Sequence, residues 1–201
     1  MTWLRSFAAT VAVAAVLGAA LPAAGKDFSL AAASPGDWAK YLVSTDNKTV
    51  AMMSQKDQAR WRIMRVKVGT DRRIRMDTII EMTPGRKTTP LGSVIQLDKP
   101  YDPLFLGGEA GFQTISTSNE VVTVKGKSYA CTKIVRKLDR PEKLDMGQTA
   151  WRGTSTVWLS GEVPLGLVKM VNDYEETMGQ PMKVVQTWLL DDSGFRNWTG
   201  N

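Results

Sequence analysis

Hydrophobic and polar residues alternate with a period of two along much of the chain, most clearly in the run RRIRMDTIIEM at residues 72–82. A period of two over this length is typical of a half-buried antiparallel strand. The pattern therefore predicts a strand whose inner face is apolar and whose outer face is charged, with Ile79 as the exception. The inner face would carry Ile74, Met76, Thr78, Ile80 and Met82, and the outer face Arg73, Arg75, Asp77 and Glu81.

The preceding run, RWRIMRVKV at residues 60–68, also alternates, but its phase slips once. Trp61 and Ile63 follow one phase, whereas Val66 and Val68 follow the other. One extra residue swaps the two faces of a strand, which is what a β-bulge does. We therefore predict a bulged strand that forms a hairpin with the strand after it.

Similar alternation, punctuated by Gly and Pro, predicts further strands. The first ordered element would begin at Trp38, and a hairpin over 120–138 would turn at Lys125-Gly126-Lys127, where Gly supplies the positive φ of a tight turn. Residues 46–59 fit either a short helix or a ragged hairpin, and residues 99–112 fit a loop. Other strands are expected at 93–98, 154–160, 167–175 and 181–192.

The turn GEVPLG at residues 161–166 is unusual because it is apolar as well as rich in Gly and Pro. Pro164 costs no ladder hydrogen bond in a turn, and the two glycines let the backbone reverse. We expect Val163 and Leu165 to fold back over the end of the core. The alternative is an ordinary loop whose apolar residues are incidental.

These runs amount to about eight or nine strands, with turns spaced as an all-β meander requires. A sheet of this size must curl or close. We therefore expect a mainly β fold, a curved antiparallel sheet or incomplete barrel, with one or two short helices packed on it or inside it.

The N-terminus has the features of a signal peptide, with Arg5, then an apolar stretch from Phe7 to Leu21, then a small-residue site at Ala23-Ala24-Gly25. The alternative, a membrane anchor, is disfavoured because about 20 apolar residues are needed to span a bilayer. No cysteine follows the site, which disfavours lipoprotein attachment. We predict a signal peptide at 1–25 and one β-rich domain at 26–201, located in a bacterial periplasm or secreted. No later segment is long and apolar enough to cross a membrane.

Positive charge is concentrated in residues 60–87, which carry nine Lys and Arg against three Asp and Glu, in a chain of net charge +6. This basic hairpin indicates partners with negative charge: lipid head groups, acidic glycans or an acidic protein surface. Export argues against nucleic acid. The alternative is a hairpin whose basic outer face is merely solvated.

The residue types present exclude several kinds of chemistry. The chain has no histidine and one cysteine, Cys131, so histidine-dependent catalysis, most zinc sites and an intramolecular disulfide are ruled out. We expect no enzyme activity, no metal and no cofactor, and a buried, inert Cys131. A hydrolase built on Glu162 or on Asp191 and Asp192 remains as an alternative, but adjacent strand residues point to opposite faces.

The layout of the chain resembles small exported bacterial proteins of uncharacterised function. A signal peptide is followed by a Trp-bearing first strand, a basic hairpin, VKGKSYACTKI at 124–134 and TVWLSGEVPLGLVKM at 156–170. More loosely, the chain is similar to the periplasmic lipoprotein-carrier half-barrels. That resemblance implies a curved antiparallel sheet around a helix-plugged apolar cavity, gated by an arginine inside the barrel. The resemblance assigns that role to no particular arginine here.

The function that we predict is binding or carriage of a lipid or a lipid-modified ligand. Aromatic and Met-rich positions on a concave sheet, beside a basic rim, suit an amphiphile with an anionic head. Two alternatives remain open: a closed core with no ligand, and an interaction module whose 60–87 hairpin docks on an acidic partner. The predicted ligand-binding residues are Trp61, Arg73, Arg75, Met76, Ile80, Trp158 and Trp188.

Overall fold

The computed structural model describes eight stretches of the chain. These are residues 33–48, 56–70, 73–83, 86–89, 91–96, 112–144, 147–178 and 180–197. The predicted signal peptide at 1–25 and residues 99–111 of the predicted loop lie outside the described residues.

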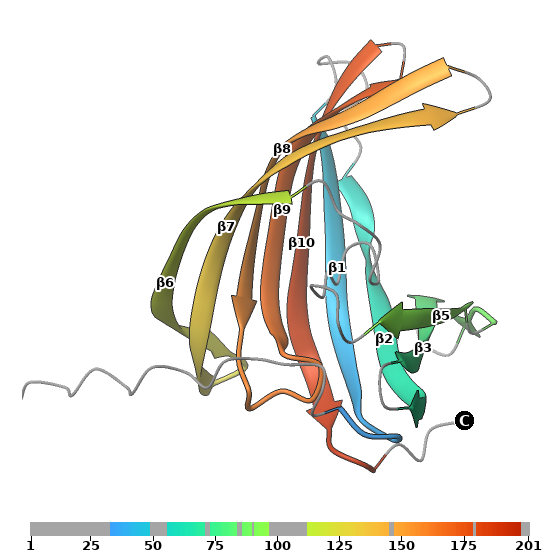
Figure 1. Ribbon diagram of the computed structural model, residues 1–201, viewed down its shortest axis with the longest axis vertical. Coiled ribbons are helices and arrows are strands. Elements are labelled where there is room, and N and C mark those ends of the chain that lie inside the picture. The colour runs from blue at the N-terminus through green and yellow to red at the C-terminus, as the bar shows by residue number, and fades with distance from the viewer. Residues whose placement is uncertain are drawn as a thin grey trace, which may run out of the picture.

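A single ten-stranded antiparallel sheet makes up most of the described part (Figure 1). Neighbouring strands follow the order β4-β3-β2-β1-β10-β9-β8-β7-β6, and β5 also pairs with β3. The sheet is curved, but it does not close into a barrel, because β6 at one end pairs with none of the strands at the other. The expected curved antiparallel sheet is therefore confirmed. The strands are β1 (Trp38–Lys48), β2 (Lys56–Thr70), β3 (Arg73–Thr83), β4 (Arg86–Lys87), β5 (Leu91–Gln96), β6 (Phe112–Val124), β7 (Lys127–Leu144), β8 (Gly147–Leu159), β9 (Leu167–Met178) and β10 (Gln180–Gly194).

The described residues contain no helix, so the one or two short helices that we expected are not found there, and nothing in this part crosses a membrane as a helix. Residues 46–48 end β1 and residues 56–59 begin β2. Asp46 lies opposite Lys56, so this region is a hairpin at its base. Residues 49–55, where a short helix was the alternative, lie outside the described residues.

The predicted β-bulge in β2 is confirmed, but it falls later than we expected. The pairing of β2 with β3 shifts between Val66 and Val68. Val66 lies opposite Met76, whereas Val68 lies opposite Arg75. Directly opposite residues share a face. Val68 therefore lies on the same face as Trp61 and Ile63, and Val66 lies on the other face.

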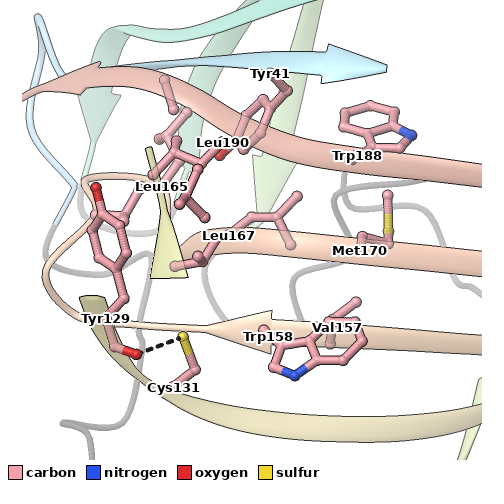
Figure 2. Packing of buried hydrophobic residues seen from close by; sticks show 14 of the residues in the cluster. Tyr41, Tyr129, Cys131, Val157, Trp158, Leu165, Leu167, Met170, Trp188 and Leu190 are labelled. Atoms are coloured by element: carbon pink, nitrogen blue, oxygen red, sulfur yellow. Dashed lines mark hydrogen bonds between the residues drawn. The ribbon is translucent and has the colours of Figure 1, made fainter. Parts of the chain in front are cut away.

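One face of the sheet is buried along most of its width, and we call it the buried face. The register aligns Val157, Met170, Trp188 and Val43 across β8, β9, β10 and β1. Figure 2 shows the first three of these side chains side by side. The face continues into β3, where Ile80 lies opposite Arg62 and Arg62 lies opposite Tyr41. Position 76 lies four residues before Ile80 on β3, so it shares this face, as the alternation predicted.

The opposite face of β3 is not the solvated charged face that we expected. Asp77 is 2% exposed and Glu81 is 8% exposed, and Ile79 between them is also buried. Glu81 is an ion-pair partner of Lys40 on β1, with 3.4 Å between Nζ and Oε2. Position 79 lies opposite Ile63 of β2. The carboxylates are therefore part of the packing between strands.

The sheet folds over itself where β6 and β7 join. Lys125 and Gly126 have φ of 51° and 81°, the positive values that a two-residue hairpin turn requires, and the predicted turn is confirmed. Val124 and Tyr129 flank this turn and belong to one buried cluster with Tyr41, Leu165 and Leu190 (Figure 2). Lys125 forms an ion pair with Asp191 of β10. We call this region the closed end.

The turn between β8 and β9 completes the closed end in the way the sequence predicts. Val163 and Leu165 are buried within the cluster, so the apolar turn does fold over the end of the core. The Ser160 N–H donates to the carbonyl of Gly166, with 2.8 Å between the two atoms, and the Gly166 N–H donates to Val163 at 2.9 Å. Gly166 has a φ of 72°, which a residue with a side chain adopts only with strain.

Candidate functional site

A row of polar residues crosses the buried face one step away from the closed end. Arg136 of β7 lies opposite Ser155 of β8, and Ser155 lies opposite Asn172 of β9. Asn172 in turn lies opposite Gln186 of β10. Because directly opposite residues share a face, the four side chains form one line across four strands, which we call the polar row.

Hydrogen bonds connect the members of the polar row in pairs. Arg136 Nη2 donates to Ser155 Oγ at 3.0 Å, and Asn172 Nδ2 donates to Gln186 Oε1 at 3.5 Å. Gln186 Oε1 also accepts from the indole N–H of Trp188 at 2.8 Å. Ser155 and Asn172 are 0% exposed and Arg136 is 9% exposed, so these groups are held inside the protein.

Apolar residues flank the polar row on both sides. Towards the closed end lie Val157, Met170 and Trp188, and the Trp188 ring lies 5.9 Å from that of Tyr41, between centroids. On the far side the register aligns Leu138, Gly153, Tyr174 and Val184. The buried face thus has one polar line between two apolar ones.

Gly153 is needed where this second apolar line crosses β8. A methyl group on Gly153 would overlap the carbonyl oxygen of Asp173 and lie 2.6 Å from Tyr174 Cα. The missing side chain lets β9 approach closely, and the Tyr174 ring packs instead against Trp151, with 6.1 Å between ring centroids. The polar row therefore sits on a tightly packed pair of strands.

The polar row places a buried cation and a buried acceptor on one face. The positions next to Arg136 on this face are Thr114 and Ser155 across the sheet and Ile134 and Leu138 along the strand. Burying a charged group is costly unless hydrogen bonds compensate it. Within the described residues, Asn172 Oδ1 is buried and accepts no hydrogen bond. The row therefore combines a buried cation with an acceptor that lacks a donor.

The structure divides the predicted ligand-binding residues between the two faces of the sheet. Trp188 lies on the buried face, and the register assigns Met76 and Ile80 to the same face, with Ile80 partly exposed. Trp61, Arg73 and Arg75 lie at positions on the opposite face. The side chains of Trp61, Arg73, Arg75 and Met76 lie outside the described residues.

Trp158 also belongs to the opposite face, so it does not share a surface with Trp188. It lies opposite Lys133 and Lys169, whose ammonium groups are 5.4 Å and 4.7 Å from its ring centroid. Lys133 also pairs with Glu120 at 3.0 Å, and this hydrogen bond, followed by that of Trp158, lowers the pKa of Glu120. Trp158 itself is 7% exposed and belongs to the buried hydrophobic cluster, so this cluster joins β6, β7, β8 and β9 through a buried indole.

Sequence reasoning missed the four residues of the polar row because their signal lies between strands. Each of Ser155, Asn172 and Gln186 is two positions from a large apolar residue on its own strand, so each interrupts one face. Aligning the predicted hairpins in register would have brought these interruptions into one line. The concentration of charge at 60–87 drew attention to the other half of the sheet.

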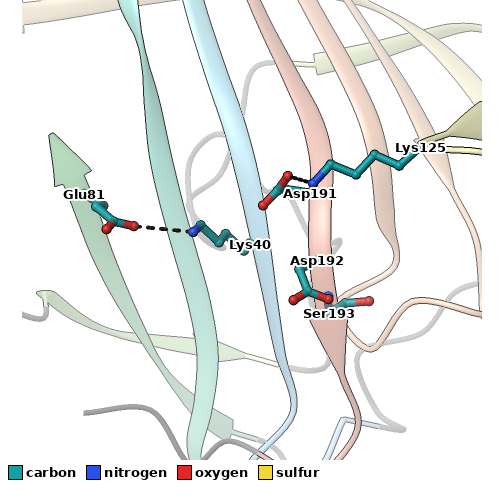
Figure 3. Close-up of polar contacts among 6 residues, drawn as sticks. All are labelled: Lys40, Glu81, Lys125, Asp191, Asp192 and Ser193. Carbon is teal, nitrogen blue, oxygen red and sulfur yellow. Dashed lines mark hydrogen bonds and ion pairs between the residues drawn. The ribbon is translucent and has the colours of Figure 1, made fainter. Parts of the chain in front are cut away.

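The carboxylates considered for a hydrolase have separate structural partners. Asp191 pairs with Lys125, and Asp192 Oδ1 accepts from the Ser193 N–H at 2.8 Å (Figure 3). Glu162 Oε1 accepts from the Ala130 N–H at 3.4 Å. Asp191 is the extra residue of a bulge between β10 and β1.

Cys131 is buried, as expected, and burial raises the pKa of its thiol to about 11. Its Sγ donates to the carbonyl of Tyr129 at 3.5 Å. Among the described residues, no group of three Cys, Asp or Glu side chains gathers as metal ligands would.

No protein-family model matches the chain, and no curated protein sequence matches it significantly. The resemblance to the periplasmic lipoprotein carriers therefore stays a prediction.

Proposed function

We propose that this protein is an exported, non-enzymatic binding protein that holds an amphiphile with an anionic head against its buried face. The observation that carries the proposal is the polar row, in which Arg136 and Asn172 cross a surface that is otherwise apolar. Ligand sites commonly combine an apolar lining with a few convergent polar groups.

The anionic head is bound by Arg136. A guanidinium presents donors in a fixed fork that matches a carboxylate or a phosphate, and such charge-assisted bonds are roughly twice as strong as neutral ones. Asn172 Oδ1 accepts from a hydroxyl or an amide on the same head group, which relieves the cost of its burial. The resemblance implies an arginine inside the curved sheet, and Arg136 is our candidate for that role.

The tail contacts the apolar line beside the head. Val157, Met170 and Trp188 are the apolar side chains next to the head on three neighbouring strands. They are 0–2% exposed, so a tail contacts them only by displacing what covers this face. Methionine adapts to irregular shapes, which suits acyl chains of varied length. Burying each CH₂ of a tail contributes about 0.8 kcal/mol.

The test is native mass spectrometry of gently purified protein, followed by titration with two probes. Lysophosphatidylglycerol, which is anionic, is expected to bind more tightly than zwitterionic lysophosphatidylcholine. Arg136→Leu is expected to weaken binding of the anionic probe at least about tenfold, the loss of one good charge-assisted contact. Arg152→Leu, at an exposed position on β8, is the matched control and should bind normally.

Two results would overturn this proposal. One is a protein that carries no amphiphile and binds neither probe. The other is an equal loss of affinity for lysophosphatidylglycerol in Arg136→Leu and Arg152→Leu, which would show that the guanidinium on the buried face has no special role. The mass of the bound molecule distinguishes the two possible sources of such a ligand, a free lipid and a lipid-modified peptide.

The interaction module is the competing proposal, and the same protein tests it. Reversing Arg72, Arg73 and Arg75 to Glu should leave lysophosphatidylglycerol binding unchanged if the ligand lies on the buried face. Loss of a co-purifying acidic protein in this variant, with the probe still bound, would favour docking through the basic hairpin.

A further inference from the structure

Strand β6 ends the sheet with a long edge. Within the described residues it pairs with β7 alone, and every residue from Gln113 to Val121 is exposed. The strands at the other end of the sheet are shorter, because β4 has two residues and β5 has six. An edge strand presents a row of backbone N–H and C=O groups that can pair with another chain.

The β6 edge lacks most of the devices that keep such edges from pairing. Proteins protect edges with lysines, prolines, shortness or bulges. Strand β6 has thirteen residues, no Lys and no Pro, and its one bulge lies near its beginning, at Ile115. Its single charge, Glu120, is held by Lys133. The stretch from Ser116 to Val124 is therefore open to pairing.

The sequence of β6 is complementary to itself when two copies run antiparallel about Ser118. In this register Ser118 faces its own copy, Thr117 faces Asn119, and Ser116 faces Glu120. Ile115 then faces Val121 on both sides of the axis. These two are among the exposed large apolar residues of the described part, at 59% and 47% exposure. A register centred on Glu120 would instead oppose two carboxylates, which is destabilising.

We propose that two copies of this chain pair through their β6 edges, antiparallel and with the two-fold axis at Ser118. Addition of a strand at a sheet edge gains main-chain hydrogen bonds, and side-chain pairs set the register. Such an interface is isologous, because the same surface serves both subunits. The proposal is independent of any ligand on the buried face.

Cysteine cross-linking of the mature chain tests the register. Ser118→Cys should form a disulfide-linked dimer on mild oxidation, because the two thiols face each other across the axis. Val121→Cys is the matched control on the same strand: its two copies would lie about 20 Å apart, six positions at roughly 3.4 Å each, and should not cross-link. The native Cys131 is buried and is expected to stay reduced in both variants.

Sedimentation velocity tests the dimer itself. The wild-type chain should sediment as a dimer, and Ser118→Lys should weaken association at least tenfold by opposing two ammonium groups at the axis. Ser44→Lys, at an exposed position of the central strand β1, should remain dimeric. A wild-type monomer at 100 µM, no cross-link in Ser118→Cys, or equal cross-linking in both cysteine variants would each overturn the proposal.

Discussion

The closed end and the polar row are built from the same strands, yet they meet opposite demands. At the closed end, Tyr129 of β7 and Leu190 of β10 pack with Leu165, and burial of apolar surface stabilises the fold. In the polar row, Arg136 of β7 is buried and Gln186 of β10 is half-buried, at positions where apolar residues would be less costly. The packing of the closed end stabilises the fold, whereas the polar row contains polar groups that stability does not require.

The difference teaches where to expect function in a curved sheet. Replacing buried ionic groups by apolar ones is often neutral or stabilising, so a buried polar group is weak support for a role in stability. The polar row is therefore the part of the buried face where we propose that a ligand binds. The predictions below separate the two regions by their response to substitution.

The largest expected effect belongs to the closed end. Leu165→Ala should lower the free energy of unfolding by about 2–5 kcal/mol, because it removes buried methyl groups and leaves a cavity. Urea denaturation measures it. Val121→Ala removes an exposed apolar side chain and should cost far less. Comparable losses in the two variants would mean that the closed end is not a packed core.

The next effect is the pH dependence contributed by Cys131. Burial raises the pKa of its folded thiol to about 11, so the folded state binds the proton more tightly than the unfolded state does. This stability is fully present below the unfolded pKa and is lost as pH rises through the folded pKa. A shift of this size corresponds to about 3 kcal/mol between roughly pH 9 and 11.

Unfolding measured from pH 8 to 11 in the wild type and in Cys131→Ala isolates this contribution. Burial also raises the pKa of Tyr174, which titrates with the same sign in both proteins. The wild type should lose more stability than the variant over this window. Equal slopes would show that the thiol is not buried in an apolar environment.

A smaller loss is expected from Gly153→Ala beside the polar row. The new methyl group meets backbone atoms of β9, which cannot move away as a flexible side chain would. Overpacking of this kind typically costs about 1–3 kcal/mol. Gly126→Ala is not a suitable control because its φ is positive, so Thr154→Ala, at an exposed position of the same strand as Gly153, serves instead. A gain in stability in Gly153→Ala would contradict the close approach of β8 and β9.

The smallest change, and the one of opposite sign, is expected at the centre of the polar row. Asn172→Val removes a buried acceptor without a donor, so unfolding free energy should stay unchanged or rise by up to about 1 kcal/mol. Binding of lysophosphatidylglycerol should weaken in the same variant. Strong destabilisation with binding intact would assign Asn172 to the fold and not to the site.

Much of the sheet could be predicted from the sequence because period two is a local signal. The alternation at 72–82, the bulge in β2, the turn at Lys125-Gly126 and the apolar corner at Leu165 all depend on a few neighbouring residues. The sequence pattern also assigned Ile80 and Met76 to the face that carries Trp188. What it missed is the burial of Asp77 and Glu81, and the partner of Glu81, Lys40, is distant in the sequence.

The candidate site was harder to predict because it depends on the register of four strands at once. Arg136 looks like any outward-facing charge in KIVRKL until the pairing brings Ser155 and Asn172 beside it. The face of Trp158 was hard to predict for the same reason, since adjacent residues lie on opposite faces and only the pairing with Lys133 decides which face Trp158 takes. Long-range register, rather than residue type, is the missing information.

The position of β1 has a consequence for how the chain is made. It lies between β2 and β10, so the first described strand is completed by the last one. The strands before and after the gap at 97–111 form two meanders of neighbouring strands, and the pairing of β1 with β10 joins them. Pairings this distant in sequence form slowly, because a long loop must close first. A growing chain therefore cannot finish its sheet until β10 has left the ribosome.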